Sequence, residues 1–358
     1  MTFDEARAAF PVLERLAYLN AGTTGPLARR THEAMQERLR LDLEQGRGGT
    51  PYFEEMLRLR QEVRAALAAT IRVPPENVAL TTSTTDGCNI VLAGLGLGGD
   101  DEVLTSDVEH FGLIGPLHAS GARVRVAPVG TKAPGEAAQA ILDAVTPRTR
   151  LIAVSHVAWT SGNSLLPRRL KQETGLPVLV DGAQSVGAIE VDAAGIDFYT
   201  VSGQKWLCGP DPAGALYVAD PAGLRVARPS YFSQSRYEPT GAFEPAEGGP
   251  RFDSGWIGLP ALAGMEAALR DLPEGRFART LEVAARCREL LAPRVDVMTA
   301  PGQSGLVAFR SEKPAEIVSR AEQAGVIVRE IPRTGLVRVS CGWWTSERDL
   351  ERLLAVLG

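Results

Sequence analysis

The sequence predicts an α/β protein, with a large domain whose mostly parallel sheet is wrapped by helices and a smaller C-terminal α+β domain. Strand-like and helix-like segments alternate from about residue 76 onward, which is typical of parallel strands with helical crossovers. Two strand segments, RLIAVSHV and LPVLVDGA, are nearly continuous apolar runs, as expected of strands covered on both faces. A polar, Pro- and Gly-rich loop at 228–254 then precedes a different order of elements.

The expected elements follow in chain order. In the large domain we expect strands at 76–82, 101–106, 122–129, 150–157, 176–183, 197–202 and 214–220, and helices at 86–95, 111–121, 136–145 and 260–272. In the tail we expect helices at 275–293, 313–325 and 346–357, the last opening with a Ser cap and acids in its first turn, and strands at 305–311, 326–331 and 336–344.

Three segments are expected from this pattern. Residues 1–18 form an N-terminal segment that packs on the small domain, residues 19–272 form the large domain, and residues 273–358 form the small domain. The glycine-rich run GLGLGG at 94–99 follows a helix rather than a strand, so it is interpreted as a helix C-cap and turn, not as a nucleotide-binding loop.

Composition narrows the function classes. The chain has 358 residues and a net charge of −5, which argues against a nucleic-acid or anionic-membrane binder. No apolar run reaches the roughly 20 residues needed to cross a bilayer. The N-terminal MTFDEARAAF has acids where a signal peptide has bases. The four cysteines have no CxxC or metal-ligand spacing, so we expect a cytoplasmic protein without a metal site.

Polar residues collect at the predicted strand ends, where a doubly wound sheet binds its ligands. A Thr/Ser run at 81–85 precedes a helix and can hold an anion with its hydroxyls and backbone N–H groups. His110, Asp181 and Lys205 follow other strands. A desolvated lysine can form an imine with an aldehyde, and a carboxylate can pair with a protonated pyridine nitrogen. Pyridoxal phosphate (PLP) needs all three features, so the sequence predicts a PLP site.

The motifs VDGAQS and SGQKWLCGP, in this order and spacing, resemble those of the class V aminotransferases, which include cysteine desulfurases and isopenicillin N epimerase-like proteins. The resemblance runs from YLNAGTTGPL at residue 18 to SERDLERLL near the C-terminus. It implies the fold-type I architecture with a seven-stranded-type sheet, PLP as cofactor, an amino-acid substrate, and a homodimer with active sites near the interface.

The resemblance also implies roles for individual residues. Lys205 would hold the cofactor as a Schiff base and move the Cα proton, Asp181 would pair with the pyridinium, and His110 would stack on the ring. The other implied contacts are Gln184 to the ring hydroxyl, Thr84, Thr85, Ser202 and Gln204 at the phosphate end, Arg338 as the substrate-carboxylate clamp, and Asn20, Gly22 and Thr23 in a segment that closes over the substrate. From the residues alone, Arg338 is equally plausible as a surface strand-edge arginine.

Some positions depart from the family pattern. Gln204 stands where many relatives have His, and Trp159 stands where desulfurases often have Asn. The family has a Gly-Thr pair near RFDSGWIGLP, whereas here Gly255 is followed by Trp256. Desulfurases carry a persulfide-forming Cys before the clamp arginine, whereas here Cys341 comes after it. Transamination, C–S cleavage and epimerisation all stay open. A non-catalytic PLP-fold sulfur-carrier partner is a further alternative, although it predicts loss of Lys205 or Asp181, and both are present.

Overall fold

The structure, a computed structural model, describes residues 3–270 and 272–358. Residues 1 and 2 of the expected N-terminal segment, and residue 271 of the expected large domain, lie outside this description. At its centre is a seven-stranded sheet in the order β2-β8-β7-β6-β5-β3-β4, in which only β8 runs antiparallel to its neighbours. The strands are β2 (Val78–Thr81), β3 (Glu102–Ser106), β4 (Arg123–Ala127), β5 (Thr149–Ser155), β6 (Val178–Asp181), β7 (Phe198–Ser202) and β8 (Gly214–Val218). The predicted α/β class and sheet are confirmed.

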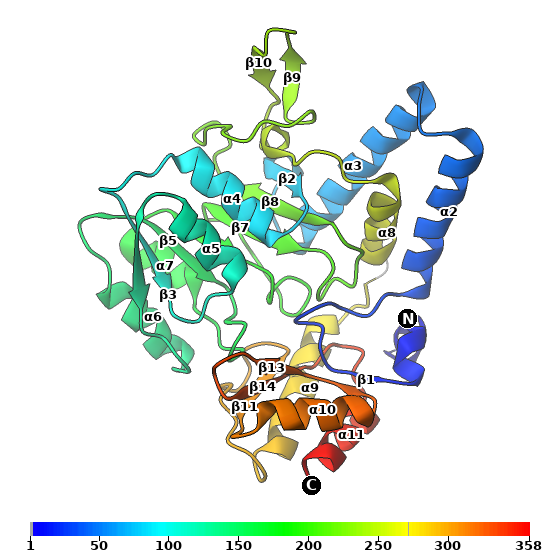
Figure 1. Ribbon diagram of the computed structural model, residues 1–358, viewed down its shortest axis with the longest axis vertical. Helices are drawn as coiled ribbons and strands as arrows, with labels where there is room; N and C mark the ends of the chain where they lie inside the picture. Colours follow the sequence, from blue (N-terminus) through cyan, green and yellow to red (C-terminus); the bar gives the residue numbers. More distant parts are fainter. Residues whose placement is uncertain (1–2, 271) are drawn as a thin grey trace.

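Helices cover both faces of this sheet (Figure 1). Along β6, Val178 and Val180 pack into one hydrophobic cluster and Leu179 into the other, because successive strand side chains point to opposite faces. The first cluster receives side chains from α3 (Thr50–Thr70), α6 (Pro134–Asp143), α7 (Pro167–Thr174) and α8 (Leu259–Arg270). The second receives them from α4 (Thr84–Leu95) and α5 (Phe111–Ala119). Burial on both faces explains the continuous apolar runs.

Two parts of the large domain differ from the expected pattern. Helices α2 (Arg29–Gln45) and α3 are long, yet their sequence patterns were not among those that predicted helices. Most of α2 is exposed, with only Thr31 fully buried, so it lacks a clear apolar stripe. The segment expected to be a loop contains a hairpin, β9 (Gln234–Tyr237) and β10 (Phe243–Pro245), which projects from the body at the end opposite the small domain (Figure 1).

The C-terminal part contains an antiparallel sheet in the order β11-β14-β13, packed with α9 (Arg276–Leu291), α10 (Pro314–Gln323) and α11 (Glu347–Leu357). Its strands are β11 (Leu306–Arg310), β13 (Arg329–Ile331) and β14 (Leu336–Ser340). The single strand expected at 326–331 is wrong: β12 (Val326–Ile327) pairs with β1 (Ala17–Tyr18), whereas β13 pairs with β14. The strand expected to run to residue 344 ends at Ser340. Helix α11 begins with a capping box between Ser346 and Asp349.

The N-terminal residues lie against this small domain. In addition to the β1–β12 pairing, Arg7 of α1 (Phe3–Ala8) forms an ion pair with Asp349 at 2.8 Å. Ala17 and Leu19 belong to the same hydrophobic cluster as β11, β14 and α11. The division of the chain at residues 18 and 272 stays a prediction.

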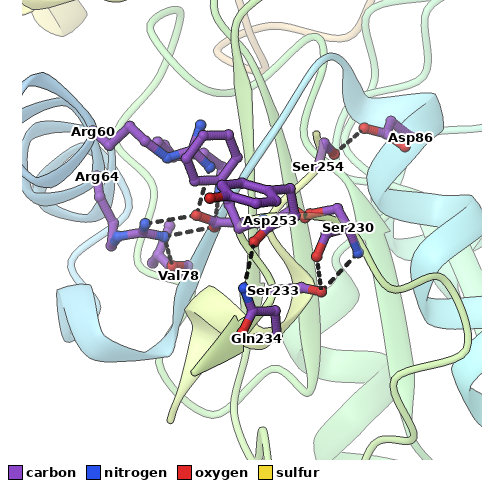
Figure 2. Close-up of polar contacts among 12 residues, drawn as sticks. Arg60, Arg64, Val78, Asp86, Ser230, Ser233, Gln234, Asp253 and Ser254 are labelled. Carbon is purple, nitrogen blue, oxygen red and sulfur yellow. Dashed lines mark hydrogen bonds and ion pairs between the residues drawn. The ribbon is translucent and has the colours of Figure 1, made fainter. Parts of the chain in front are cut away.

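A buried carboxylate fixes the segment that follows the hairpin. Asp253 is 2% exposed at its side chain and accepts from Arg60 at 2.7 Å, from Arg64 at 2.8 and 2.9 Å, and from the backbone N–H of Leu80 at 2.8 Å. The next residue, Ser254, donates to Asp86 in the first turn of α4 (Figure 2). The hairpin segment is therefore anchored both to α3 and to the N-terminus of α4.

Candidate active site

The carboxyl ends of the parallel strands bring the predicted residues together. Asp181 is the last residue of β6 and Ser202 the last of β7, and these strands pair in parallel. Lys205 follows three residues later, and α4 begins at Thr84 shortly after β2 ends. The predicted C-cap of α4 is confirmed, because Gly96 follows the helix in the left-handed conformation with φ 61°.

The backbone around Lys205 is held closely against the N-terminal segment. The carbonyl of Lys205 accepts from Cys208 N–H at 3.0 Å, and the carbonyl of Gln204 accepts from Gly25 N–H at 2.8 Å. A Cβ on Gly25 would lie 2.0 Å from the Lys205 carbonyl oxygen, so only glycine fits there. Residues far apart in sequence thus fix the position of this lysine.

The pKa of the Lys205 amine is lower than that of an ordinary lysine. Desolvation lowers its pKa from 10.5 to about 8, the negative charge of Asp181 opposes that shift, and the positive charges of Arg338 and Arg329 add to it. A substantial fraction of the amine is therefore neutral near physiological pH, as imine formation requires.

Asp181 and His110 lie within electrostatic range of this amine. Asp181 is 3% exposed, and its Oδ1 accepts from Ala183 N–H at 2.9 Å. His110 caps α5, with Nδ1 accepting from Gly112 N–H at 3.1 Å, so the neutral ring carries its proton on Nε2. Desolvation and then the charge of Lys205 lower the pKa of His110, which favours that neutral form.

A neighbouring carboxyl holds the turn that carries His110. Glu109 accepts from Ser106 Oγ at 2.5 Å, from Ser155 Oγ at 2.5 Å and from Ser155 N–H at 2.9 Å, which ties the turn to the end of β5. Desolvation raises the pKa of Glu109 to about 7 despite these donors. In the sequence, only the position of Glu109 directly before His110 indicated that it belongs to the site.

The residues predicted to bind the phosphate lie at the start of α4 and at the end of β7. Ser83 caps the helix by accepting from Asp86 N–H at 3.2 Å, and Thr84 and Thr85 form its first turn. Ser202 Oγ donates to Gln204 Oε1 at 2.6 Å. Gln204 accepts through its oxygen, so its amide nitrogen can donate to an anion. The helix dipole and these hydroxyl groups form a suitable site for a phosphate.

Gln184 and Gly22 join the two parts of the site. Gln184 is 4% exposed, donates from Nε2 to the Gly22 carbonyl at 2.8 Å and accepts at Oε1 from Trp206 Nε1 at 3.0 Å. A Cβ on Gly22 would lie 2.8 Å from Arg338 Nη2 and 2.9 Å from Gln184 Oε1. Glycine at this position lets the N-terminal segment pass between the lysine site and Arg338.

Arg338 is interior rather than a surface strand-edge residue. It lies on β14, the middle strand of its sheet, and is 0% exposed. Nη1 donates to the Trp159 carbonyl at 3.0 Å and Nη2 to Thr23 Oγ1 at 3.3 Å, and Thr23 in turn donates to Asn20 Oδ1 at 2.8 Å. Burial, followed by the charge of Arg329, lowers the pKa of Arg338 to about 9.

A second arginine, which the sequence patterns did not single out, lies beside it. Arg329 Nη1 donates to the same Thr23 Oγ1 at 2.9 Å. Within residues 3–270 and 272–358, no carboxylate lies within ion-pair distance of Arg329 or Arg338. Two guanidinium groups therefore lie side by side at Thr23 without a carboxylate partner in these ranges. Arg329 lies on a short strand with no motif around it, so only the tertiary structure identifies it.

The residues present fit PLP. A phosphate cradle, a lysine with a lowered pKa, a buried carboxylate and an imidazole surround one region, and these are the groups that the cofactor requires. Across the described ranges, no group of three or more His, Cys, Asp or Glu side chains is placed to hold a metal. In the same ranges, no helix combines the length and the hydrophobicity needed to cross a bilayer.

Comparison with known proteins identifies the family. The family model for Aminotransferase class-V matches residues 17–353. An isopenicillin N epimerase from Streptomyces clavuligerus is 29% identical over 99% of this chain and 97% of its own length. A cysteine desulfurase from Escherichia coli is 28% identical over 100% of this chain and 98% of its own length.

Two solved structures of the cystine C-S lyase C-DES are also similar. One, a Lys-to-Ala mutant with glycine covalently linked to its PLP cofactor, has a TM-score of 0.91 and 30% identity over 98% of each chain. The other, a complex with the reaction product cysteine persulfide, has a TM-score of 0.90 and 30% identity over 97% of this chain and 98% of that one. The chain belongs to the class V aminotransferase family and is a PLP-dependent enzyme of fold type I.

Proposed function

We propose that this enzyme cleaves the C–S bond of a sulfur-containing amino acid that carries two carboxylates, of the cystine type. The observation that carries the proposal is the pair Arg329 and Arg338, which share Thr23 Oγ1 and lack a carboxylate partner among the described residues. A guanidinium suits bidentate binding of a carboxylate, so two of them suit a substrate with two. Similarity to a cystine C-S lyase supports the same choice.

The residues would divide the work as follows. Arg338 binds the α-carboxylate, Arg329 binds the second carboxylate, and Lys205 holds the cofactor and moves the Cα proton. Asp181 keeps the ring nitrogen protonated, His110 covers the ring, Gln184 donates to the ring hydroxyl, and Thr84, Thr85, Ser202 and Gln204 hold the phosphate. The bound cofactor supplies the electron sink that stabilises negative charge at Cα.

The overall reaction balances without a redox partner. Removal of the Cα proton allows the Cβ–S bond to break, and sulfur leaves with the bonding electrons as a persulfide. With one water, cystine gives cysteine persulfide, pyruvate and ammonia. A cysteine nucleophile is not needed, and all four cysteines of the chain are buried thiols. Buried reduced thiols also suit the cytoplasmic location that we propose.

Product analysis on a panel of amino acids tests the proposal. We expect the holoenzyme to release pyruvate, ammonia and sulfane sulfur from cystine at least tenfold more efficiently than from cysteine, which has one carboxylate. Arg329→Gln should remove most of this preference while leaving kcat/KM for cysteine nearly unchanged, because hydrogen bonds to charged groups contribute about 1.5–3 kcal/mol. Lys205→Ala should abolish turnover.

Epimerisation at Cα is the alternative function, and it predicts different products. Similarity to an isopenicillin N epimerase makes proton exchange at Cα the second candidate function. Incorporation of solvent deuterium at Cα, without pyruvate or sulfane sulfur from any thiol or disulfide amino acid, would favour epimerisation. Equal efficiency with cystine and cysteine in the wild-type enzyme would contradict the two-carboxylate substrate.

We also propose a homodimer with its active sites near the interface. An aromatic face defined by Phe53, Tyr231 and Trp256 is 40%, 56% and 55% exposed. Tyr231 stacks on Trp256 at 6.3 Å, close to the Asp253 anchor. Exposed apolar area of this kind favours a protein partner, and a second copy would cover it. Trp256→Glu should convert a dimer to a monomer in light scattering, whereas a monomeric wild type would reject the proposal.

A further inference from the structure

Trp159 lies between His110 and the two arginines Arg329 and Arg338. Its ring meets the His110 ring edge-to-face, with centroids 5.1 Å apart and planes at 89°. The Cζ atoms of Arg329 and Arg338 lie 5.7 and 6.0 Å from its centroid, at the limit of cation–π attraction, and its carbonyl accepts from Arg338. One residue therefore contacts both guanidinium groups and the imidazole beside Lys205.

The indole nitrogen of Trp159 is buried and has no hydrogen-bond partner among residues 3–270 and 272–358. Trp343 and Trp344 also have unpaired indole nitrogens, but these two pack against Phe10 in an apolar cluster. An unpaired donor in an apolar cluster has no acceptor to meet. At Trp159 two guanidinium groups lie 5.7 and 6.0 Å from the centroid of the ring that carries the donor, so an anionic acceptor would be favoured there.

The loop that carries Trp159 is fixed from the small-domain side. Ser304 Oγ donates to the Gly162 carbonyl at 2.9 Å, and Ala300 N–H donates to Asn163 Oδ1 at 2.8 Å. A Cβ on Gly162 would lie 2.8 Å from Leu306 Cβ, so the loop packs directly on β11. The ring is consequently held in place before a substrate arrives, which suits a residue that selects among substrates.

We infer that Trp159 determines substrate specificity: its indole N–H donates to the second carboxylate of the substrate, beside Arg329, and its ring keeps the two guanidinium groups in place. This inference rests on the proposed function. We assign the second carboxylate to Arg329 rather than Arg338, because Arg329 donates to one acceptor in the protein and Arg338 to two. Arg329 therefore has more N–H groups left for the substrate. A substrate with one carboxylate leaves the indole donor unsatisfied and is bound less well.

Binding of an unreactive probe tests the role of the indole N–H. Dithiodipropionate has the two carboxylates and the disulfide of cystine but no amine, so it cannot react with the cofactor. Its affinity for the holoenzyme is measured by calorimetry in wild type, Trp159→Phe, Arg329→Gln and the matched control Trp343→Phe. Phenylalanine keeps an aromatic face and removes only the donor. Propionate, with a single carboxylate, reports whether the Arg338 side of the pocket is intact.

We expect Trp159→Phe to weaken dithiodipropionate binding about tenfold or more, with propionate binding and the Trp343→Phe variant unchanged. In turnover, Trp159→Phe should raise KM for cystine with little change in kcat or in the KM for cysteine. If Arg329→Gln weakens the probe and Trp159→Phe does not, the inference is wrong and the proposed substrate class stands. If neither variant weakens it and wild type binds probe and propionate alike, the proposed function fails as well.

Discussion

Two pairs of arginines, each with one buried and one half-buried member, have opposite surroundings in this protein. Arg60 and Arg64 share one carboxylate, Asp253, which is hydrogen-bonded on both oxygens (Figure 2). Arg329 and Arg338 share only the hydroxyl oxygen of Thr23 and the ring face of Trp159, and Arg338 alone also donates to the Trp159 carbonyl. One carboxylate charge partly neutralises the first pair. The second pair has no carboxylate within ion-pair distance among the described residues.

The difference distinguishes a structural site from the proposed substrate-binding site. A buried ion pair that includes its own carboxylate holds segments together, here α3, β2 and the end of the hairpin segment. Buried cations without a carboxylate are costly unless a ligand supplies one. In the proposed function, a substrate carboxylate supplies the missing charge at Arg338.

The largest effect is expected at the paired site. Asp253→Asn leaves Arg60 and Arg64 buried without a counter-charge and should lower the free energy of unfolding by about 3–5 kcal/mol. Chemical denaturation of the PLP-free protein measures it. Glu190→Gln, which breaks the exposed Arg72–Glu190 pair, is the control and should cost less than about 1 kcal/mol. If both variants lower the free energy of unfolding by similar amounts, the buried cluster stabilises the protein no more than an exposed ion pair does.

Arg338→Met should behave in the opposite way. Removing a buried cation that has no counter-charge should leave the free energy of unfolding of the PLP-free protein within about 1 kcal/mol of wild type or above it. The same change should reduce kcat/KM by a factor equivalent to about 2–5 kcal/mol, because a buried carboxylate contact is lost. A variant that unfolds as readily as Asp253→Asn would place Arg338 among the structural arginines.

The smallest expected effect is a shift in the pKa of Lys205, which the charges of Arg338 and Arg329 lower. Covalent attachment of PLP to the apoprotein needs a neutral Lys205, so the attachment rate should rise with pH through a midpoint of about 8. The charge of Arg338 disfavours the ammonium form, so Arg338→Met should move this midpoint upward. Absorbance of the bound cofactor after borohydride reduction gives the rate. A wild-type midpoint near the ordinary 10.5, or a downward shift in the variant, would contradict this electrostatic picture.

Much of the large domain could be predicted because its signals are local. The β6 and β7 runs, the Ser83 cap and the glycine after α4 each reflect physics within a few residues. Helix α2 was missed because its exposed surface lacks an apolar stripe. The hairpin β9–β10 was missed because its strands are polar and exposed, without the alternation that marks a half-buried strand.

The sequence by itself determined the sheet and the cofactor class, and it predicted the lysine, aspartate and histidine of the site, because each of these three residues comes at or just after the end of a strand that the sequence predicts. Only the tertiary structure decided that Arg338 is interior, that Arg329 joins it at Thr23, and that Trp159 lies between them and His110. The hydrogen bonds of the two arginines join residues more than a hundred positions apart. Their burial and missing counter-charge depend on what surrounds each side chain, and local sequence patterns carry no record of that.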